Sequence, residues 1–479
     1  MATSVLMTDG YKVSMAEAGW PLRRETFYYA HRKGLGVVPF DVEQELKGLL
    51  PTLTADDLAF LNRNQYEPGA AFRAAFERGG ELKVSALPKG AAFLPREPVF
   101  SVSGPSALVS WLEPLLLMWS WRIQLATEAL LRPESLPGLL GALTCDAQAE
   151  LAKRTLDELK VPAPAIKVDS AGYQARVGAR AKELREIVGD PGRLFEVGLR
   201  AASCMEQHLL ALAALKGEGV TRTSNVYGAK QLGLVPVGTM GHEHVQRYGS
   251  DDAAFRAMAE RRPQRSSYLL DTYDTMASGI PAAYALIAER PNEKDSIRYD
   301  SGDKEAQYRF AAAEAKKLGI RPVQILEDGF DAPQTRRFEV LRAEVGWKPE
   351  EQVYGYGGYF IAGPTGSPLT RDKVAAVYKL SQTGHRPTMK FANEAGSGKQ
   401  SVPGRPVLFR RRAGEGPAGI IGQEGEAPPN GYFLLTGNAL ESAASLANVD
   451  AAGAVVLSRA SEALVAEAKA AAFGRSGAS

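Results

Sequence analysis

The sequence predicts an α/β fold, namely an irregular α/β barrel with a second α+β domain built from the N- and C-terminal segments. Three observations lead to this prediction. The chain of 479 residues is longer than one ordinary domain. Its middle repeats a strand–helix rhythm, and its two ends lack that rhythm. We therefore expect an N-terminal α+β domain over 1–110, a catalytic barrel over 111–387, and a C-terminal segment, 388–479, that completes the α+β domain.

The middle of the chain, residues 165–380, repeats short apolar runs that end in polar and glycine residues, each followed by an amphipathic stretch. Met205, Leu209 and Leu212 have the spacing of a helix face, and Gly319 stands where a helix would end. Alternating strands and helices predict a mostly parallel sheet, and eight or nine such units suit an α/β barrel. The expected strands are AIKVDS, RLFEVGLR, GVTRTSN, VPVGTMGH, SSYLLDTYD, SIRYDSGD, VQILEDGFD, QVYGYGG and VAAVYKL.

The two ends of the chain have a different pattern. Residues 1–110 mix strands and short helices, and RPVLFRR and NGYFLLTG predict strands before a C-terminal alanine-rich helix. The most apolar run, ALVSWLEPLLLMWSW, contains Glu113 and Pro114 and is shorter than the roughly 20 unbroken apolar residues of a membrane span. It therefore predicts a buried helix.

The composition is that of a soluble globular protein, with 45% hydrophobic and 23% charged residues. With 57 basic and 55 acidic residues, nothing favours a nucleic-acid or membrane partner, whereas small anions stay open as ligands. The two cysteines, Cys145 and Cys204, have no CxxC partner, so we expect neither a disulfide framework nor a thiolate zinc site. A polar N-terminus without signal-peptide character agrees with this, and we expect a cytoplasmic protein.

Polar residues follow nearly every expected strand. Ligands of α/β barrels meet the carboxyl ends of the strands. Each residue alone could be a loop residue or a helix cap, but the set together predicts a ligand site at this end of the barrel. Its members are Asp169, Glu196, Arg200, Thr223, Ser224, Asn225, His242, Asp271, Asp274, Arg298, Asp300, Asp303, Glu327 and Asp328.

Two histidines lie close together at one of these strand ends. The chain has five histidines, and His242 and His244 are two residues apart behind a Gly-Thr-Met-Gly turn. Histidine acts easily near neutral pH as base, nucleophile or ligand. The pattern alone leaves open whether this pair is chemical or an ordinary loop end.

Glycine-containing strand ends suit a phosphorylated sugar. In RYDSGD, Arg298 fits phosphate oxygens, and the carboxylates accept ribose hydroxyls or hold magnesium through water. ILEDGFD repeats this arrangement one unit later, although Asp331 is equally suited to cap a helix. YGYGGYF, residues 354–360, offers bare backbone amides to a phosphate or forms a tight turn.

Together the motifs resemble nicotinate phosphoribosyltransferase, a member of the type II phosphoribosyltransferases, nearly from end to end. Any one motif is a weak signal, and ten in the family's order are a strong one. They are LMTDGYKVSMA (6–16), TFYYAHRKG (26–34), WLEPLLLMWSWRIQLATEA (111–129), EVGLRAA (196–202), RTSN (222–225), VGTMGHE (237–243), IRYDSGD (297–303), LEDGFD (326–331), YKL (378–380) and KQSVPGRPVLFRR (399–411).

The resemblance implies an ATP-dependent enzyme, formally a ligase, that makes nicotinate mononucleotide and pyrophosphate from nicotinate and phosphoribosyl pyrophosphate. ATP and Mg²⁺ are the implied cofactors, and we expect no metal ion bound directly by protein side chains. A homodimer with shared active sites is the implied assembly.

The resemblance also implies the catalytic residues. His242 is the implied phosphohistidine that couples ATP hydrolysis to ribosyl transfer, and Asp300 would grip the ribose. Glu196, a further implied catalytic residue, or Glu243 would hold the other ring nitrogen of the histidine. His244 has no usual counterpart in the family, and we expect it on the surface at the start of a helix.

The implied substrate contacts come from several strand ends. The pyridine ring is expected near Tyr11 and Arg32 of the neighbouring subunit and near Arg200. The other implied contacts are Thr223, Ser224, Asn225, Arg298, Gly329, Gly357 and Gly358. Thr223, Ser224 and Asn225 can donate hydrogen bonds and carry no negative charge, so they favour the carboxylate of nicotinate over the amide of nicotinamide.

Some features depart from the family's pattern. Ala201 follows Arg200 where a second arginine is common, so one anion contact is missing or comes from elsewhere. Gly241 stands where alanine is usual, which should loosen the turn before His242. The segment DGYKVSMAEAGWP leans toward the related nicotinamide phosphoribosyltransferase.

Three alternatives therefore stay open. The chain could use nicotinamide. It could be another barrel enzyme acting on a sugar phosphate, such as an aldolase, for which Lys379 is the one lysine suited to form a Schiff base. It could also sense pyridine nucleotides without catalysis, although His242 and RYDSGD argue against this.

Overall fold

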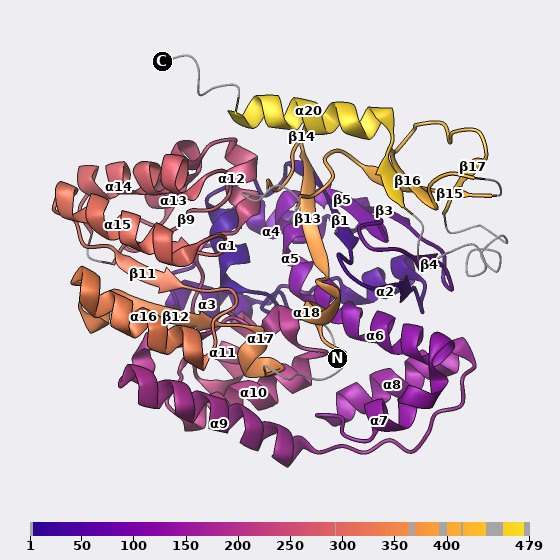
Figure 1. Cartoon of the computed structure of the whole chain (residues 1–479), viewed down its shortest axis with the longest axis horizontal. Helices are drawn as coiled ribbons and strands as arrows, with labels where there is room; N and C mark the ends of the chain where they lie inside the picture. Colours follow the sequence, from indigo (N-terminus) through magenta and orange to yellow (C-terminus); the bar gives the residue numbers. More distant parts are fainter. Residues whose placement is uncertain are drawn as a thin grey trace.

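The computed structural model describes residues 3–292, 294–363, 369–391, 400–412, 415–436 and 454–473. Within these residues the strands form a seven-stranded sheet, a five-stranded sheet, and smaller sheets of four and two strands. Figure 1 shows the helices of the chain's middle part gathered on one side of the molecule and the C-terminal helix α20 along its upper edge.

The seven-stranded parallel sheet confirms the predicted α/β class, but it is a curled half-barrel rather than a closed barrel. Its order is β8-β7-β6-β12-β11-β10-β9, and no pairing among the described residues joins β8 to β9. Neighbouring strands run parallel throughout. The strands are β6 (Leu194–Glu196), β7 (Arg222–Thr223), β8 (Val235–Pro236), β9 (Ser267–Leu269), β10 (Ser296–Tyr299), β11 (Val323–Leu326) and β12 (Gln352–Tyr356).

Helices alternate with these strands, as predicted. Asp303 accepts a hydrogen bond from the Ala306 N–H at the start of α15, and Gly319 ends that helix with a left-handed φ of 67°. Asp331 caps α16 in the same way. The helices are α8 (Asp146–Leu159), α9 (Ser170–Val188), α10 (Met205–Gly217), α11 (Val226–Leu232), α12 (His242–Tyr248), α13 (Asp251–Arg261), α14 (Ile280–Glu289), α15 (Lys304–Leu318), α16 (Ala332–Val345), α17 (Gly358–Ile361) and α18 (Arg371–Val374), with a π-helical turn over Thr275–Gly279.

Two of the predicted barrel strands are wrong. AIKVDS makes only an isolated bridge between Val168 and Leu143, because its N–H groups at Lys167 and Asp169 donate to the carbonyls of Leu140 and Leu143 rather than to a neighbouring strand of the sheet. VAAVYKL contributes instead to β13 (Val377–Thr383), which pairs antiparallel with β1.

The antiparallel sheet has the order β14-β13-β1-β5-β3. Residues 377–387 belong to it through β13 and β14. Its strands are β1 (Arg24–Ala30), β3 (Lys83–Ala86), β5 (Phe100–Pro105), β13 and β14 (Arg386–Pro387), beside the pair β2 (Gly36–Val37) and β4 (Ala92–Phe93). The helices of this part are α1 (Gly10–Glu17), α2 (Val42–Leu49), α3 (Ala55–Arg63), α4 (Ala70–Glu77), α5 (Ser106–Trp111), α6 (Glu113–Leu131) and α7 (Leu136–Leu140).

The C-terminal strands form a separate sheet with the order β17-β15-β16-β18. It packs against the N-terminal part through a buried ion pair in which Arg410 Nη2 lies 2.7 Å from Glu97 Oε2. The elements are β15 (Pro406–Arg411), β16 (Gly419–Gln423), β17 (Tyr432–Leu434), β18 (Val455–Leu457) and α20 (Arg459–Phe473). The predicted strands and alanine-rich helix of this segment are thereby confirmed.

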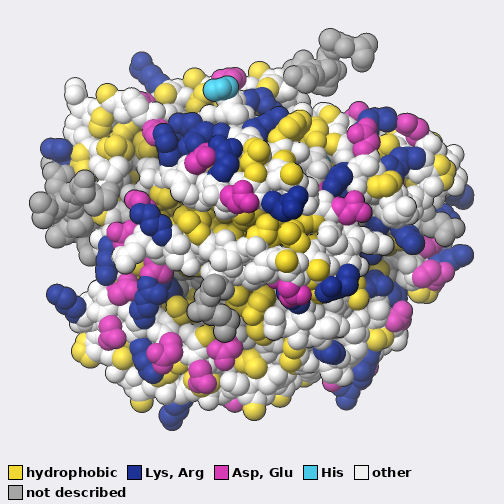
Figure 2. Space-filling model, turned by 180° about the vertical axis from the view of Figure 1, so that it is seen from behind, with side chains coloured by type: hydrophobic (Ala, Val, Ile, Leu, Met, Phe, Trp, Pro, Cys, Tyr) yellow, Lys and Arg dark blue, Asp and Glu magenta, His cyan; other side chains and the backbone are white. Residues whose placement is uncertain are grey.

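The predicted buried helix is also confirmed. The run ALVSWLEPLLLMWSW forms α5 and the start of α6, whose residues from Ser106 to Trp121 are almost all buried. Among the described residues, no helix has the length and apolarity needed to cross a membrane. On the face shown in Figure 2, basic and acidic side chains are interspersed, and hydrophobic side chains gather in a band across the middle.

Candidate active site

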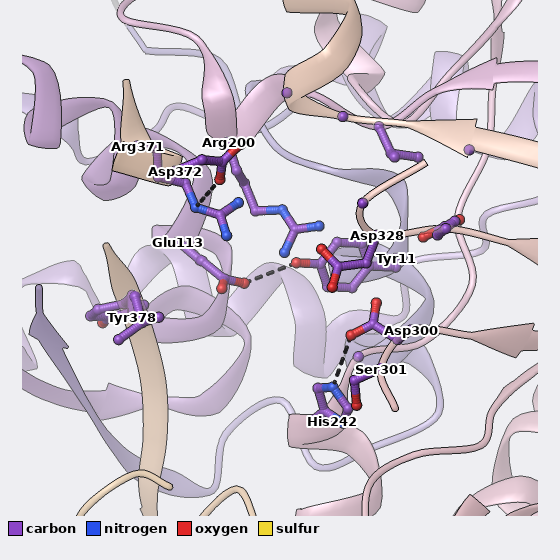
Figure 3. A pocket seen from close by; sticks show the side chains of 18 of the residues that line it. Tyr11, Glu113, Arg200, His242, Asp300, Ser301, Asp328, Arg371, Asp372 and Tyr378 are labelled. Atoms are coloured by element: carbon purple, nitrogen blue, oxygen red, sulfur yellow. Dashed lines mark hydrogen bonds and ion pairs between the residues drawn. The ribbon is translucent and has the colours of Figure 1, made fainter. Parts of the chain in front are cut away.

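A cavity of about 940 Å³ opens where the carboxyl ends of the parallel strands face α1 and β13 (Figure 3). It is strongly charged, which suits an ionic substrate. The basic side chains that line it are Lys12, Arg32, Arg200, Arg298, Arg371, Lys373, Lys379 and Lys390. The acidic ones are Glu113, Glu243, Asp300, Glu327, Asp328, Asp331 and Asp372.

His242 is the first residue of α12 and faces this cavity. Its Nε2 lies 2.8 Å from Lys390 Nζ and 3.4 Å from Asp300 Oδ2 (Figure 3), and its Nδ1 lies 3.1 Å from Thr272 Oγ1. Burial, followed by the charge of Lys390, lowers the pKa of His242, so the ring is neutral near pH 7. Because an ammonium only donates, Nε2 accepts from Lys390 and the ring proton lies on Nδ1.

Carboxylates around His242 could hold a cation. Ligand atoms of His242, Asp271 and Asp300 lie within 4.8 Å of one another. However, Lys390 Nζ lies 2.8 Å from the histidine and 3.9 Å from Asp271 Oδ2, so a positive charge is already at this point. Direct ligation by all three side chains would require Lys390 to move. The carboxylates are better arranged to bind magnesium through water.

Arg298, on β10, connects this cluster to the next strand. Its Nη1 donates to Thr239 Oγ1 at 2.5 Å, and its guanidinium lies 3.5 Å from Asp300 and 3.7 Å from Glu327. Although burial raises the pKa of Asp300, the contact with His242 and the charges of Arg298 and Lys390 bring it well below the usual range. Asp300 is therefore an anion near neutral pH, beside a guanidinium oriented for a second anion.

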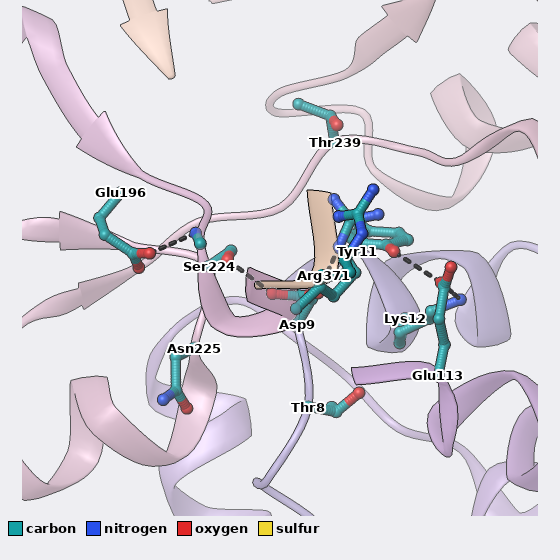
Figure 4. A network of polar contacts seen from close by, with 12 residues as sticks. Thr8, Asp9, Tyr11, Lys12, Glu113, Glu196, Ser224, Asn225, Thr239 and Arg371 are labelled. Atoms are coloured by element: carbon teal, nitrogen blue, oxygen red, sulfur yellow. Dashed lines mark hydrogen bonds and ion pairs between the residues drawn. The ribbon is translucent and has the colours of Figure 1, made fainter. Parts of the chain in front are cut away.

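Tyr11 lies on the opposite wall, held by its own network (Figure 4). Its hydroxyl donates to Glu113 Oε2 at 2.9 Å, and Lys12 Nζ lies 2.5 Å from that carboxylate and 3.1 Å from Glu243 Oε1. The guanidinium of Arg200 lies 5.4 Å from the centre of the Tyr11 ring. An aromatic face beside a guanidinium suits a flat ring that carries a negative group.

Glycines and Lys379 complete the cavity. Gly329, with φ of 75°, and Gly357 and Gly358 bring bare backbone to its wall. A Cβ on Gly358 would lie 2.3 Å from Asp372 Oδ2, so the Asp372 side chain would have to move to make room for it. Burial lowers the pKa of Lys379, on β13, to about 7.

The comparisons with known proteins agree on one family. No family model matches the chain. The chain is 27% identical over 369 residues to a nicotinate phosphoribosyltransferase of Bos taurus, covering 73% of this chain and 64% of that protein. It is 27% identical over 302 residues to a nicotinate phosphoribosyltransferase of Bacillus subtilis, covering 60% and 57%. It thus spans about three fifths of the length of these curated relatives.

Solved structures share the fold. A nicotinate phosphoribosyltransferase from Porphyromonas gingivalis superposes with a TM-score of 0.60 at 20% identity, covering 84% of this chain and 96% of that chain. One from Vibrio cholerae gives 0.54 at 20% identity, covering 81% and 88%. These similarities support the assignment of the chain to the type II phosphoribosyltransferase family.

The cavity contains most of the residues that the resemblance implied. His242, Asp300, Tyr11, Arg32, Arg200, Arg298, Gly329, Gly357 and Gly358 all line it. Tyr11 and Arg32 line this cavity in the same chain as His242, and Tyr11 reaches it because α1 packs against the carboxyl ends of the parallel strands. The contribution of both residues from a neighbouring subunit stays a prediction.

Glu196 and the RTSN segment, residues 222–225, lie outside the cavity lining, so the structure does not bring them together with the other predicted site residues. Glu196 is fully buried, 2.9 Å from His208 Nε2, and accepts a hydrogen bond from Thr223 Oγ1 at 2.6 Å. Ser224 donates to Asp9 at 2.6 Å (Figure 4), and Asn225 caps α11. The N-terminal segment causes this arrangement.

That segment covers the end of β7. The Gly10 N–H donates to the Ser224 carbonyl at 2.7 Å, and Asp9 forms a bridge with Asn225. The donors that sequence reasoning assigned to nicotinate are therefore used within the protein. These donors therefore give no evidence for nicotinate over nicotinamide.

Two further predictions about the histidine pair are wrong. Neither Glu196 nor Glu243 contacts His242, because the former pairs with His208 and the latter with Lys12. His244 is fully buried rather than on the surface, and its Nε2 lies 3.0 Å from the Ala254 carbonyl on α13. Since residues two apart point to different sides of a helix, α12 directs one histidine to the cavity and the other into the core.

Several residues that line the cavity were not predicted from the sequence as site residues. Lys390 and Glu113 each lie within apolar stretches, where an isolated charge is a signal for a buried functional group. Ala201, which stands where a second arginine is common, lines a different cavity. Arg371, Lys379 and Lys390 supply positive charge to this one. Gly241 has a packing reason, because a Cβ there would lie 3.1 Å from Tyr11 Cε2.

Proposed function

We propose that this protein is a nicotinate phosphoribosyltransferase that forms nicotinate mononucleotide and pyrophosphate from nicotinate and phosphoribosyl pyrophosphate. The observation that carries the proposal is the group His242, Asp300 and Arg298 at the strand ends, opposite Tyr11 and Arg200 in one charged cavity. The names of the similar Bos taurus and Bacillus subtilis proteins support the same activity.

The transfer needs charge stabilisation and orientation rather than a base. Pyrophosphate leaves the anomeric carbon with the bonding electrons, and the pyridine nitrogen attacks the carbon as positive charge develops there. A pyridine nitrogen carries no proton at neutral pH, so no proton has to be removed. Asp300 would orient the ribose hydroxyls and oppose the developing charge, and Arg298 would bind an anionic group of the substrate.

The other walls would hold the remaining parts of the substrates. Backbone around Gly329, Gly357 and Gly358 would bind the 5′-phosphate. The pyridine ring would lie against Tyr11, with its carboxylate toward Arg200. Mg²⁺ would neutralise the pyrophosphate, held through water by carboxylates such as Asp300 and Asp271.

We further propose that ATP phosphorylates His242. The neutral Nε2 lone pair would attack the γ-phosphorus, the bond to the β-phosphate oxygen would break, and ADP would leave. Lys390, 2.8 Å from that nitrogen, would stabilise the transferred phosphoryl group, and Thr272 would hold the Nδ1 proton. Water would later hydrolyse the phosphohistidine.

Pyrophosphate release tests the proposal, measured with nicotinate and with nicotinamide, each with and without ATP. We expect turnover with nicotinate that ATP increases. Equal or greater turnover of nicotinamide would overturn the substrate assignment, and a rate independent of ATP would overturn the coupling.

A second candidate rests on Lys379. Its lowered pKa of about 7 and its place in the cavity fit a Schiff-base lysine of an enzyme acting on a sugar phosphate. Borohydride trapping with a carbonyl sugar phosphate distinguishes the two functions. Covalent label that Lys379→Met removes would favour the second candidate, and an absence of label would favour the phosphoribosyltransferase.

A further inference from the structure

A second cavity of about 300 Å³ lies beside the first, and residues of α9 and of the turns before α8 and α10 line it. Arg371, Thr370 and the segment 362–363 line both cavities, so the two are neighbours. The reaction proposed above uses none of the residues described next.

Two turns of the same design form one wall of this cavity. In the first, the N–H and the hydroxyl of Thr144 both donate to Gln148 Oε1, at 2.7 and 2.9 Å. In the second, the same groups of Ser203 donate to Gln207 Oε1, at 2.7 and 2.8 Å. The cysteines that follow Thr144 and Ser203 hold the turns together, with their Sγ atoms 3.5 Å apart.

This design leaves both glutamine NH₂ groups free to bind a ligand. Because each Oε1 accepts from a backbone N–H, the amide orientation is fixed, and each nitrogen is the remaining donor. Neither nitrogen donates to any residue that the structure describes. The helices that begin at these turns, α8 and α10, also lack side-chain caps, although Glu206 accepts from the Ala147 N–H of α8.

A buried tyrosine faces the same space. Tyr173 is 3% exposed, lines the cavity, and its hydroxyl has no hydrogen-bond partner among the described residues. A buried hydroxyl without a partner is costly unless a ligand satisfies it. Arg176 and Arg180, one and two turns further along α9, add positive charge to the wall.

We infer that this second cavity is a binding site for a phosphate group, on inorganic phosphate or a small phosphate ester. The amides of Gln148 and Gln207 come from the two turns, and the hydroxyl of Tyr173 and the guanidinium groups of Arg176 and Arg180 come from α9. Arg176 also lies 3.4 Å from Asp169 Oδ2, and Arg180 Nη2 donates to the Phe360 carbonyl at 2.7 Å, so each guanidinium has further N–H groups to offer. A phosphate group, with three strong acceptor oxygens and a charge close to −2, can accept from both walls at once. The N-terminus of α10, which has no side-chain cap, adds a favourable field for the same charge.

Titration with inorganic phosphate at constant ionic strength tests this inference on the full chain. Tyr173→Phe should weaken one phosphate-binding phase about tenfold, because a hydrogen bond to a charged group is typically worth at least one decade. Arg176→Gln should weaken the same phase, more strongly at low salt. In Tyr173→Phe the melting temperature should not fall, since the hydroxyl has no protein partner to lose.

Two control variants separate this site from the first cavity and from general effects on folding. Arg298→Met, in the first cavity, should leave this phase unchanged. Tyr284→Phe, which loses a hydrogen bond to the Ala311 carbonyl, should lower the melting temperature without changing phosphate binding. If either Tyr173→Phe or Arg176→Gln binds phosphate as the wild type does, or if Arg298→Met abolishes all binding, the inference is wrong.

Discussion

Replacing Arg298 by methionine should separate substrate binding from stability. The side chain is 10% exposed and lies 3.5 Å from Asp300 and 3.7 Å from Glu327. If it binds an anionic group of phosphoribosyl pyrophosphate, its loss should cost about 1.5–3 kcal/mol, or roughly one to two decades in affinity. Isothermal titration with phosphoribosyl pyrophosphate and Mg²⁺ measures this change.

The same replacement leaves a buried carboxylate without its cation. Removing one partner of a buried pair costs about 3–5 kcal/mol. Burial already raises the pKa of Glu327, and Arg298 opposes that rise, so the variant raises the pKa further. A carboxyl group with a raised pKa binds more protons in the folded state, so stability falls as pH rises toward the folded pKa. The deficit should therefore be small near pH 4 and largest at neutral pH and above.

The double variant Arg298→Met/Glu327→Gln separates the two effects. It should recover most of the stability at pH 7.5, measured by urea unfolding, because no buried charge remains unpaired. It should not recover the affinity for phosphoribosyl pyrophosphate. An affinity restored together with stability would refute the reasoning, because Arg298 would then act only as a structural partner.

Three further predictions follow from the geometry of the cavity. Because burial lowers the pKa of Lys379 to about 7, the cavity loses one positive charge as pH rises above 7, and KM for its anionic substrates should rise. Lys379→Met should flatten that profile, and a wild-type KM that is constant from about pH 6 to 8.5 would contradict this. Ser224→Asp should lower the melting temperature rather than change KM selectively, because the new carboxylate would lie beside Asp9, which accepts a hydrogen bond from Ser224 at 2.6 Å. A stable variant with a raised KM for nicotinate would show that Ser224 contacts the substrate. Mixing Tyr11→Ala with His242→Asn should restore no activity, because one chain brings both residues to one cavity; recovery on mixing would mean that subunits share their sites.

The sequence predicts the parallel sheet and the strand-end chemistry well, because both depend on local pattern. The strand–turn–helix rhythm and the polar strand ends are short-range features, and His242, Arg298 and Asp300 follow from them. The confirmed caps at Asp303 and Gly319 are local in the same sense. These features are set by the residues nearest to them along the chain.

The wrong predictions concern contacts between distant segments. Thr223 and Ser224 are used by Glu196 and Asp9, and no local pattern says that residues 8–12 pack onto the end of β7. Lys390, which contacts His242 across 148 positions, is hidden for the same reason. The predicted surface position of His244 is wrong because α12 is buried on both sides and leaves no exposed position for this residue.

The central claim is that His242 is the nucleophile toward ATP, and labelling with γ-³²P-ATP tests it most directly. The wild type should retain acid-labile, base-stable label, as expected for a phosphohistidine, and His242→Asn should lose both the label and ATP hydrolysis while slow, uncoupled ribosyl transfer persists. His244→Asn should melt at a lower temperature, because it disturbs a buried contact to Ala254, and its folded fraction should still be labelled. Label that persists in His242→Asn, or a wild type that takes up no label and gains no rate from ATP, would contradict the account.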